Sequence, residues 1–317
     1  MKFPRLFLKP LIVATAILSL PIAFIKPADA QREQTFLWTI ESPNNTVYLL
    51  GSVHVLRSTD YPLPQPIQDA FDDAEYLMFE VNFDDLNTVN TQNLLLQAAL
   101  PDSPQEDFRS ALGTDTYQLA ENAVSEVGLP ISMFDRFEPW FFSMLLPSLR
   151  LSQLGFDPMY GVDPYLFNAA QDAEKPVAAL ETVEEQVGFF DNLSVQTQVA
   201  LVEQTVLELD TIESSFNVLL DAWRSGDVDT FEPLTLESFN QYPEVYDVLL
   251  RQRNQNWLPT VESLINQPND FLVVVGAAHL VGPDSLIRLL QNNGHVVDQV
   301  GQELDQAGQP LTFDGDL

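Results

Sequence analysis

The sequence predicts a mixed α/β fold, in which one mixed central sheet carries a large helical insertion. Two observations lead to this fold class. Short apolar runs rich in β-branched residues lie near both ends of the chain, and amphipathic, helix-like segments fill the region between them. The chain has 317 residues, 45% of them hydrophobic, which is enough for a sizeable core. We expect a single domain over residues 31–317, with its helical middle section at about 84–269.

The first thirty residues have the pattern of a secretory signal peptide. Three basic residues precede the apolar run 11–25, and the small-residue end "ADA" closes at Ala30. We therefore expect cleavage after Ala30, export to the periplasm or the extracellular space, and no stable membrane span afterwards. The alternative is an uncleaved membrane anchor, against which Pro21 and the short apolar run both argue.

Two predicted strands form a hairpin near the start of the mature chain. The apolar runs "TFLWTI" and "TVYLLGSV" flank the turn-like segment "ESPNN". Four further runs with strand composition follow along the chain, at residues 75–83, 175–181, 271–276 and 295–300. In the first of these, alternation places Glu80 on the face opposite Leu77, Phe79 and Val81.

Two helices are predicted with identifiable ends. Apolar residues recur at steps close to 3.5 from Ser194 to Gly226, which predicts one long amphipathic helix capped by the Ser194 hydroxyl. A second helix follows residue 282, with Pro283 in its first turn and Gly294 just past its end. Residues 271–300 therefore predict a strand, a loop, a helix and a strand, which is a βαβ unit.

Composition excludes several classes of function. The chain has no cysteine, so disulfides, a thiol nucleophile and a lipoprotein anchor are ruled out. The formal net charge is −32 at pH 7, and such a surface repels nucleic acid and anionic headgroups. We interpret the charge as a solvated acidic surface; a specific cationic partner is the alternative.

Two copies of a Gly-x-x-His motif are the most informative feature of the sequence. "GSVH" ends at His54 and "GAAH" ends at His279, and each follows a predicted strand. The carboxyl ends of strands are the edge where open α/β sheets place their sites. Two imidazoles and one carboxylate suit a transition metal with open coordination positions, so Glu80 is the candidate third ligand or general base. The alternatives are ordinary packing histidines and a strand-end carboxylate.

Arg253 is the next candidate, because it shares a helix face with Leu249, Leu250 and Trp257. A guanidinium among apolar residues needs an anionic partner. It either forms a structural ion pair with Asp163 or Glu181, or clamps a substrate carboxylate or oxyanion.

Supporting roles follow for three of the remaining candidates. We expect Asp163, Glu181 and Tyr160 to orient the imidazoles or the guanidinium. His295 opens the last predicted strand and is interpreted as structural.

These segments together resemble the TraB/PrgY/GumN family, which includes the animal Tiki proteins. The matching stretches are "GSVHVL", "FEVN", "YGVDPYL", "KPVAALETVEEQ", "RNQNW" and "VVVGAAHLVGPDSLIRLLQNNGHVV", spread over residues 35–300. The resemblance implies a mixed α/β fold with the twin histidines at one site. Tiki proteins are membrane-associated metalloproteases that need manganese or cobalt and clip a secreted signalling protein, so the resemblance assigns His54, His279 and Glu80 to the active site. Zinc is an alternative metal.

Two classes of function remain open at this stage. One is a metal-dependent hydrolase of exported peptides. The other is a peptide-binding or sequestering protein without turnover, since PrgY and TraB members are linked to the sequestering or inactivation of peptide pheromones. A metal-free esterase is disfavoured, because no Gly-x-Ser-x-Gly motif occurs. The Tiki membrane topology and substrate are not expected to transfer to this chain.

Overall fold

The computed structural model describes residues 34–301, except 87, 102, 104–106 and 241. The predicted signal peptide therefore lies outside the described residues. Within them, a six-stranded mixed sheet and surrounding helices confirm the predicted fold class. No helix in this part of the chain is long and apolar enough to cross a membrane.

The sheet combines four parallel strands with an antiparallel edge. Its order is β4-β3-β5-β2-β1-β6, and β4, β3, β5 and β2 run parallel, whereas β1 is antiparallel to both β2 and β6. The strands are β1 (Leu37–Glu41), β2 (Thr46–Ser52), β3 (Tyr76–Phe79), β4 (Val177–Ala179), β5 (Phe271–Gly276) and β6 (Asp298–Gln299). The predicted hairpin is therefore confirmed, and β3, β4 and β6 are shorter than predicted.

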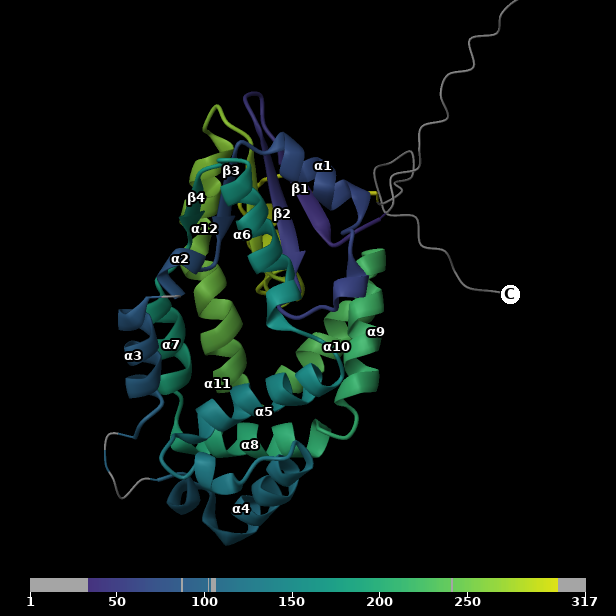
Figure 1. Ribbon diagram of the computed structural model, residues 1–317. Helices are drawn as coiled ribbons and strands as arrows, with labels where there is room; N and C mark the ends of the chain where they lie inside the picture. The colour runs from purple at the N-terminus through teal and green to yellow at the C-terminus, as the bar shows by residue number, and fades with distance from the viewer. Residues whose placement is uncertain (1–33, 87, 102, 104–106, 241, 302–317) are drawn as a thin grey trace, which may run out of the picture. The chain divides into compact units, whose positions relative to one another are not determined.

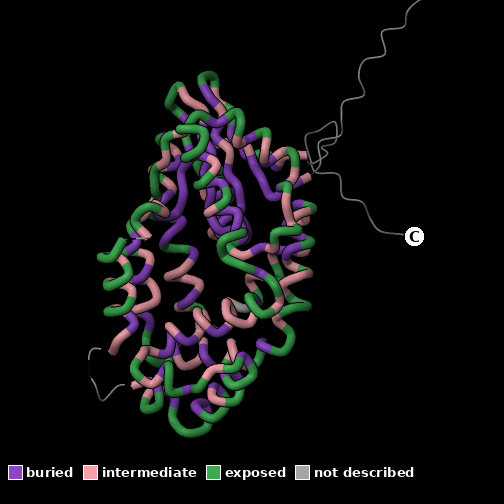
Figure 2. The backbone as a smooth tube through the Cα atoms, viewed as in Figure 1, coloured by how far each residue is buried: buried purple, intermediate pink, exposed green. Residues whose placement is uncertain are grey.

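The central strand β5 is buried along its whole length, which explains its continuous run of apolar residues. Figure 1 shows helices on both sides of the sheet, and Figure 2 shows its strands as the most continuously buried part of the molecule. In β3, Leu77, Met78 and Phe79 are all buried, so alternation alone does not separate two faces there.

The chain between β3 and β5 is largely helical, as predicted. The α-helices of the whole described chain are α1 (Gln65–Asp73), α2 (Phe83–Leu86), α3 (Val89–Ala98), α4 (Phe108–Glu126), α5 (Pro139–Gln153), α6 (Val162–Asp172), α7 (Val183–Asp191), α8 (Val195–Glu208), α9 (Ile212–Ser225), α10 (Val228–Asn240), α11 (Pro243–Tyr246), α12 (Gln252–Ile265) and α13 (Leu286–Asn292). The 3₁₀-helices are η1 (Ser58–Asp60), η2 (Ile131–Met133), η3 (Pro158–Tyr160) and η5 (Ala277–Leu280), and η4 (Asp247–Arg251) is a π-helix between α11 and α12.

The single long helix predicted from Ser194 to Gly226 is wrong, because the structure has two helices, α8 and α9. The Thr211 hydroxyl donates to the carbonyl of Glu208 at the break, an alternative to continued helix pairing. The two helices also pack into different clusters of buried apolar residues. Val202 of α8 packs with α4 and α5, whereas Trp223 of α9 packs under the sheet and donates to the carbonyl of Gly51 at 2.6 Å. Apolar periodicity could not reveal this change of partner.

The last predicted helix begins later than expected. Ser285 caps α13 by accepting from the backbone N–H of Arg288, so placing Pro283 in the first turn was wrong. Gly294 follows the helix with a positive φ of 94°, as its predicted position requires. The final strand β6 runs in the same direction as β5 but is separated from it by β2 and β1.

Candidate functional site at the carboxyl edge of the sheet

Four neighbouring parallel strands deliver the candidate residues to one edge. Ser52 at the end of β2 lies opposite Gly276 at the end of β5, and Phe79 at the end of β3 is paired with both β5 and β4. The residues that follow these ends are His54, His279, Glu80 and Glu181. Because parallel strands end at the same edge, residues that are far apart along the chain meet there.

The backbone at Gly276 marks the point where these side chains come closest. A Cβ atom added to Gly276 would lie 3.3 Å from Glu80 Oε1, 3.3 Å from His54 Nε2 and 3.7 Å from His279 Cδ2. The motif glycine therefore allows the close approach of Glu80 and His54, whereas the distance to His279 is an ordinary contact. Glycine is needed at position 51 for a different reason. A Cβ atom there would lie 2.6 Å from Phe36 Cδ1, so glycine allows the Phe36 ring to pack against this strand in the core.

His54 is oriented by Asp163 in the first turn of α6. Its Nδ1 lies 3.0 Å from Asp163 Oδ2, and the Ser52 hydroxyl donates to Asp163 Oδ1 at 2.7 Å. The Asp163 carboxylate raises the pKa of His54 to about 9, through its charge and its hydrogen bond. The side chain of His54 is 66% exposed, so this imidazole faces solvent while its Nδ1 is fixed.

His279 is buried, and its exposed fraction is 3%. Its Nε2 lies 3.1 Å from Arg253 Nη1, which can only donate, so Nδ1 carries the proton and donates to Asn254 Oδ1 at 2.7 Å. The ring also packs on Trp257 at 4.5 Å between centroids. Burial lowers the pKa of His279 to about 3, which keeps the imidazole neutral.

Glu80 is ionised and held at both oxygens. Oε1 accepts from the Gly276 backbone N–H at 2.7 Å, and Oε2 accepts from Arg253 Nη2 at 2.5 Å and from Gln186 at 3.1 Å. Burial favours the neutral acid, but the Arg253 charge, together with the two histidines and the Gly276 N–H, outweighs it and lowers the pKa of Glu80 to about 2. Oε1 is also 3.7 Å from His279 Nε2.

Arg253 is enclosed by protein groups, which satisfy all five of its N–H donors. Nε and Nη2 donate to Glu181, Nη2 also donates to Glu80, and Nη1 donates to the Leu249 carbonyl and to His279. Of the two partners considered from sequence, Glu181 is the one found, and Asp163 pairs with His54 instead. Burial raises the pKa of Glu181, although Arg253 opposes this.

Tyr160 and His295 do not take part in the hydrogen-bond network described above. Tyr160 is 42% exposed, and the structure shows no hydrogen bond from its side chain to the other described site residues. His295 precedes β6, hence lies at the opposite edge of the sheet, and contacts Glu262 at 3.2 Å. The structural interpretation of His295 is consistent with this position.

Sequence reasoning missed Asn254 and Gln186, which hold His279 and Glu80. Both lie inside stretches that had drawn attention, "RQRNQNW" and "LETVEEQ". Asn and Gln are common on protein surfaces, and no sequence pattern distinguishes Asn254 and Gln186 from exposed amide side chains. A π-helix, η4, immediately precedes α12, which contains Asn254, and it alters the helical register that pattern analysis assumes.

A family model for TraB/PrgY/gumN matches residues 36–299, nearly the whole described chain. The chain belongs to the TraB/PrgY/gumN family. This TraB/PrgY/gumN protein is 27% identical over 248 residues to the uncharacterized protein YbaP of Escherichia coli, covering 78% of this chain and 89% of YbaP.

More distant relatives carry the name metalloprotease. Metalloprotease TIKI2 of Xenopus tropicalis is 23% identical over 338 residues, covering 90% of this chain but 62% of TIKI2. Metalloprotease TIKI1 of Danio rerio is 24% identical over 330 residues, covering 87% of this chain and 64% of TIKI1. The family member described here thus spans less than two thirds of these relatives. No solved structure matches it.

The donor types at the edge fit the divalent cation that the resemblance implies. Two imidazoles and a carboxylate converge, and each imidazole has its Nδ1 held by another side chain, as in many metal sites. Within the described part of the chain, however, no group of three His, Cys, Asp or Glu residues has a metal-holding arrangement. His279 Nε2 has one lone pair, and Arg253 engages it. An ion bound there would have to replace that hydrogen bond.

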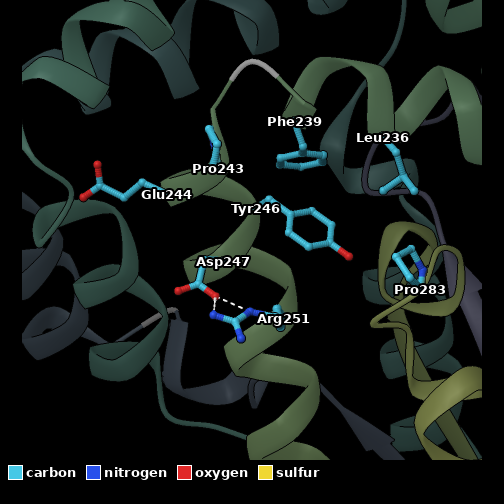
Figure 3. A pocket seen from close by; sticks show the side chains of 8 residues that line it. All are labelled: Leu236, Phe239, Pro243, Glu244, Tyr246, Asp247, Arg251 and Pro283. Carbon is cyan, nitrogen blue, oxygen red and sulfur yellow. Dashed lines mark hydrogen bonds and ion pairs between the residues drawn. The ribbon is translucent and has the colours of Figure 1, made fainter.

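A cavity of about 640 Å³ lies beside the segment that follows His279 (Figure 3). Its lining comes from α10, α11 and η4 together with Pro283. Tyr246 donates to Asp284 at 2.9 Å, and Asn254 donates to the Asp284 carbonyl at 2.8 Å, so this wall is tied to the partner of His279. Arg251 and Asp247 form an ion pair at its rim.

Proposed function

We propose that this protein is a metal-dependent hydrolase that cleaves exported peptides or protein termini. The observation that carries the proposal is the convergence of His54, Glu80 and His279 around the Cβ position of Gly276. The distant relatives named metalloprotease support the same reaction class. In this proposal the reaction takes place outside the cytoplasm, after removal of the predicted signal peptide.

The residues of the edge have distinct tasks in the proposed reaction. Glu80 stays ionised at neutral pH, because Arg253 and the other groups around it hold its pKa far below its usual range. As a carboxylate it either completes the ligand set of the ion or accepts a proton from water. Asp163 fixes the His54 ring, and Asn254 fixes the tautomer of His279 so that Nε2 carries the lone pair, which a bound ion would have to take over from Arg253. Arg253 positions Glu80 and Glu181, since its own donors are all used.

His54, His279 and Glu80 would hold the divalent ion, with manganese or cobalt expected from the resemblance. Such an ion would supply electrostatic activation of water and of the scissile carbonyl.

Peptide cleavage with a matched histidine control tests the proposal. The protein is incubated with a pool of synthetic unstructured peptides and Mn²⁺, and products are followed by mass spectrometry. We expect cleavage that a chelator abolishes, a loss of at least about 100-fold in His54→Ala, and full activity in His295→Ala. Full activity of the His54→Ala variant in the presence of a chelator would contradict the proposal.

The same experiment tests the alternative function, a protein that binds and sequesters peptides without cleaving them. Stoichiometric peptide binding that depends on His54, with no product over time, would support a binding protein instead of an enzyme.

A further inference from the structure

A second cavity opens directly at His54, and no step proposed above uses it. Its volume is about 380 Å³, within the range of small-ligand pockets. It is lined by His54, by Phe83 and Leu86 of α2, by Pro158 and Met159 of η3, and by Asp163, Pro164, Phe167 and Asn168 of α6.

The inner wall of this cavity is aromatic and fixed. The Phe83 and Phe167 rings lie 5.3 Å apart, and Phe79 of β3 contacts both rings at 5.8 and 5.9 Å. Phe167 is buried, so the wall is anchored in the core of the sheet. Such a wall offers a preformed apolar surface to a ligand.

The outer wall is open and adaptable. Met159, on this wall, is 71% exposed. A thioether with rotatable bonds adapts to different apolar groups. Among the described residues that line the cavity, Asp163 is the one charged group besides His54, and its two oxygens are already engaged by Ser52 and His54.

The charges around the cavity select against an acidic occupant. Asp84 and Asp85 are exposed on α2, between the two residues of that helix that line the cavity. Because Asp163 is paired with His54, Asp84 and Asp85 are the groups that make the surroundings negative, in a chain whose formal net charge is −32. An uncharged apolar group is therefore favoured, and a carboxylate is disfavoured.

We propose that this cavity is a substrate subsite that takes the large apolar side chain, aromatic or leucine-like, next to the cleaved bond of a peptide. The inference rests on the proposed function and adds a substrate class to it. Because the exposed His54 ring is part of the lining, a peptide bond at His54 places a neighbouring side chain in the cavity.

Peptides that vary at one position test the subsite. In an otherwise constant cleaved peptide, each residue flanking the cleaved bond is changed to Phe, Leu, Ala or Asp, and kcat/KM is measured with the full chain. We expect Phe and Leu to exceed Ala by about 10-fold or more at one of the two positions, with Asp lowest. Equal values at both positions would overturn the inference while leaving the proposed hydrolase intact.

A charge change at the open wall gives the sharper test. Met159→Arg should lower kcat/KM for the Phe peptide and raise it for the Asp peptide, changing their ratio by about 10-fold or more. Met133→Arg is the matched control, since Met133 is also exposed (51%) but lies on η2. An unchanged ratio in Met159→Arg, or the same change in Met133→Arg, would refute the subsite.

Binding provides a readout that is independent of turnover. If the wild-type protein cleaves no peptide, the proposed function fails, and fluorescence anisotropy with labelled Phe, Ala and Asp peptides decides about the cavity. Tighter binding of the Phe peptide that Met159→Arg removes supports the subsite, whereas equal binding of all three contradicts it.

Discussion

Arg253 places one positive charge between two buried carboxylates, those of Glu80 and Glu181, at 2.5 and 2.6 Å. Its exposed fraction is 7%, so neither carboxylate can exchange this partner for bulk water. Breaking such a pair from one side leaves uncompensated buried charge, which costs far more than the pair itself contributes. The arginine is thus a structural requirement of the site as well as a positioning residue.

The first prediction compares two arginines that lie two residues apart. Arg253→Met should lower the free energy of unfolding by about 3–5 kcal/mol, because two buried carboxylates lose their cation. Arg251→Met should change it by less than about 1 kcal/mol, since Arg251 and its partner Asp247 are partly exposed. Urea denaturation measures both, and equal losses would contradict the assigned network.

The second prediction concerns the pH dependence at His54. Its folded pKa of about 9 exceeds its ordinary value of 6.5 because of Asp163. The associated stability is therefore fully present below pH 6.5 and is lost as pH rises through 9. In the metal-free protein, NMR titration should give a midpoint near 9 for the His54 ring, and Asp163→Asn should return it toward 6.5.

The chain has three histidines, so the signal of the His54 ring can be followed individually in this titration. Unfolding measured from pH 6 to 10 should show an alkaline loss in the wild type that Asp163→Asn lacks. A His54 midpoint that does not respond to Asp163→Asn would show that the carboxylate does not set its charge.

At the scale of elements, α6 connects the two halves of the His54 environment. The backbone N–H of Val162 donates to the Val53 carbonyl at 3.0 Å, and Asp163 in the next position holds the imidazole. Gly161, which precedes the helix, permits this approach, because a Cβ there would lie 2.3 Å from the His54 carbonyl oxygen. The "YGVD" stretch therefore joins helix start and site in four residues.

The third prediction tests that contact. Gly161→Ala should destabilise the protein by roughly 1–3 kcal/mol, because the methyl group meets a backbone atom that cannot move alone. It should also weaken the Asp163–His54 contact, seen as a lower His54 midpoint in the NMR titration. Gly188→Ala inside α7 is the control: its Cβ meets only Asn192 Nδ2 at 3.4 Å, so Ala should stabilise the helix by about 0.5–1 kcal/mol. Equal effects of both changes would contradict the account of α6.

The elements also show what the sequence could predict. The hairpin and β5 were predictable because their apolar runs are continuous and bounded by turn residues. The α8–α9 break was not, because apolar periodicity persists while the packing partner changes from α5 to the sheet. The surroundings of the motif glycines required the structure: Gly51 lies within β2 and Gly276 ends β5, and each allows a close approach.

At the scale of the whole molecule, the sheet order explains why residues separated by more than two hundred positions meet. β5 enters the sheet between β3 and β2, so His279 comes between Glu80 and His54. Residue composition predicts which segments form strands. The order of the strands in the sheet depends on long-range packing, which local sequence patterns do not indicate. The Gly-x-x-His repeats suggested a common edge, whereas the amide partners and the Arg253 hydrogen bonds required the structure.

A double-mutant cycle on peptide hydrolysis tests most directly whether His54 and His279 act at one site. The value of kcat/KM is measured for the wild type, His54→Ala, His279→Ala and the double variant, with folding checked by circular dichroism. If the two imidazoles work as a unit, each single change costs on the order of 100-fold or more and the double variant loses little beyond that. Losses that multiply in the double variant, or the absence of hydrolysis by the wild type, would contradict the account.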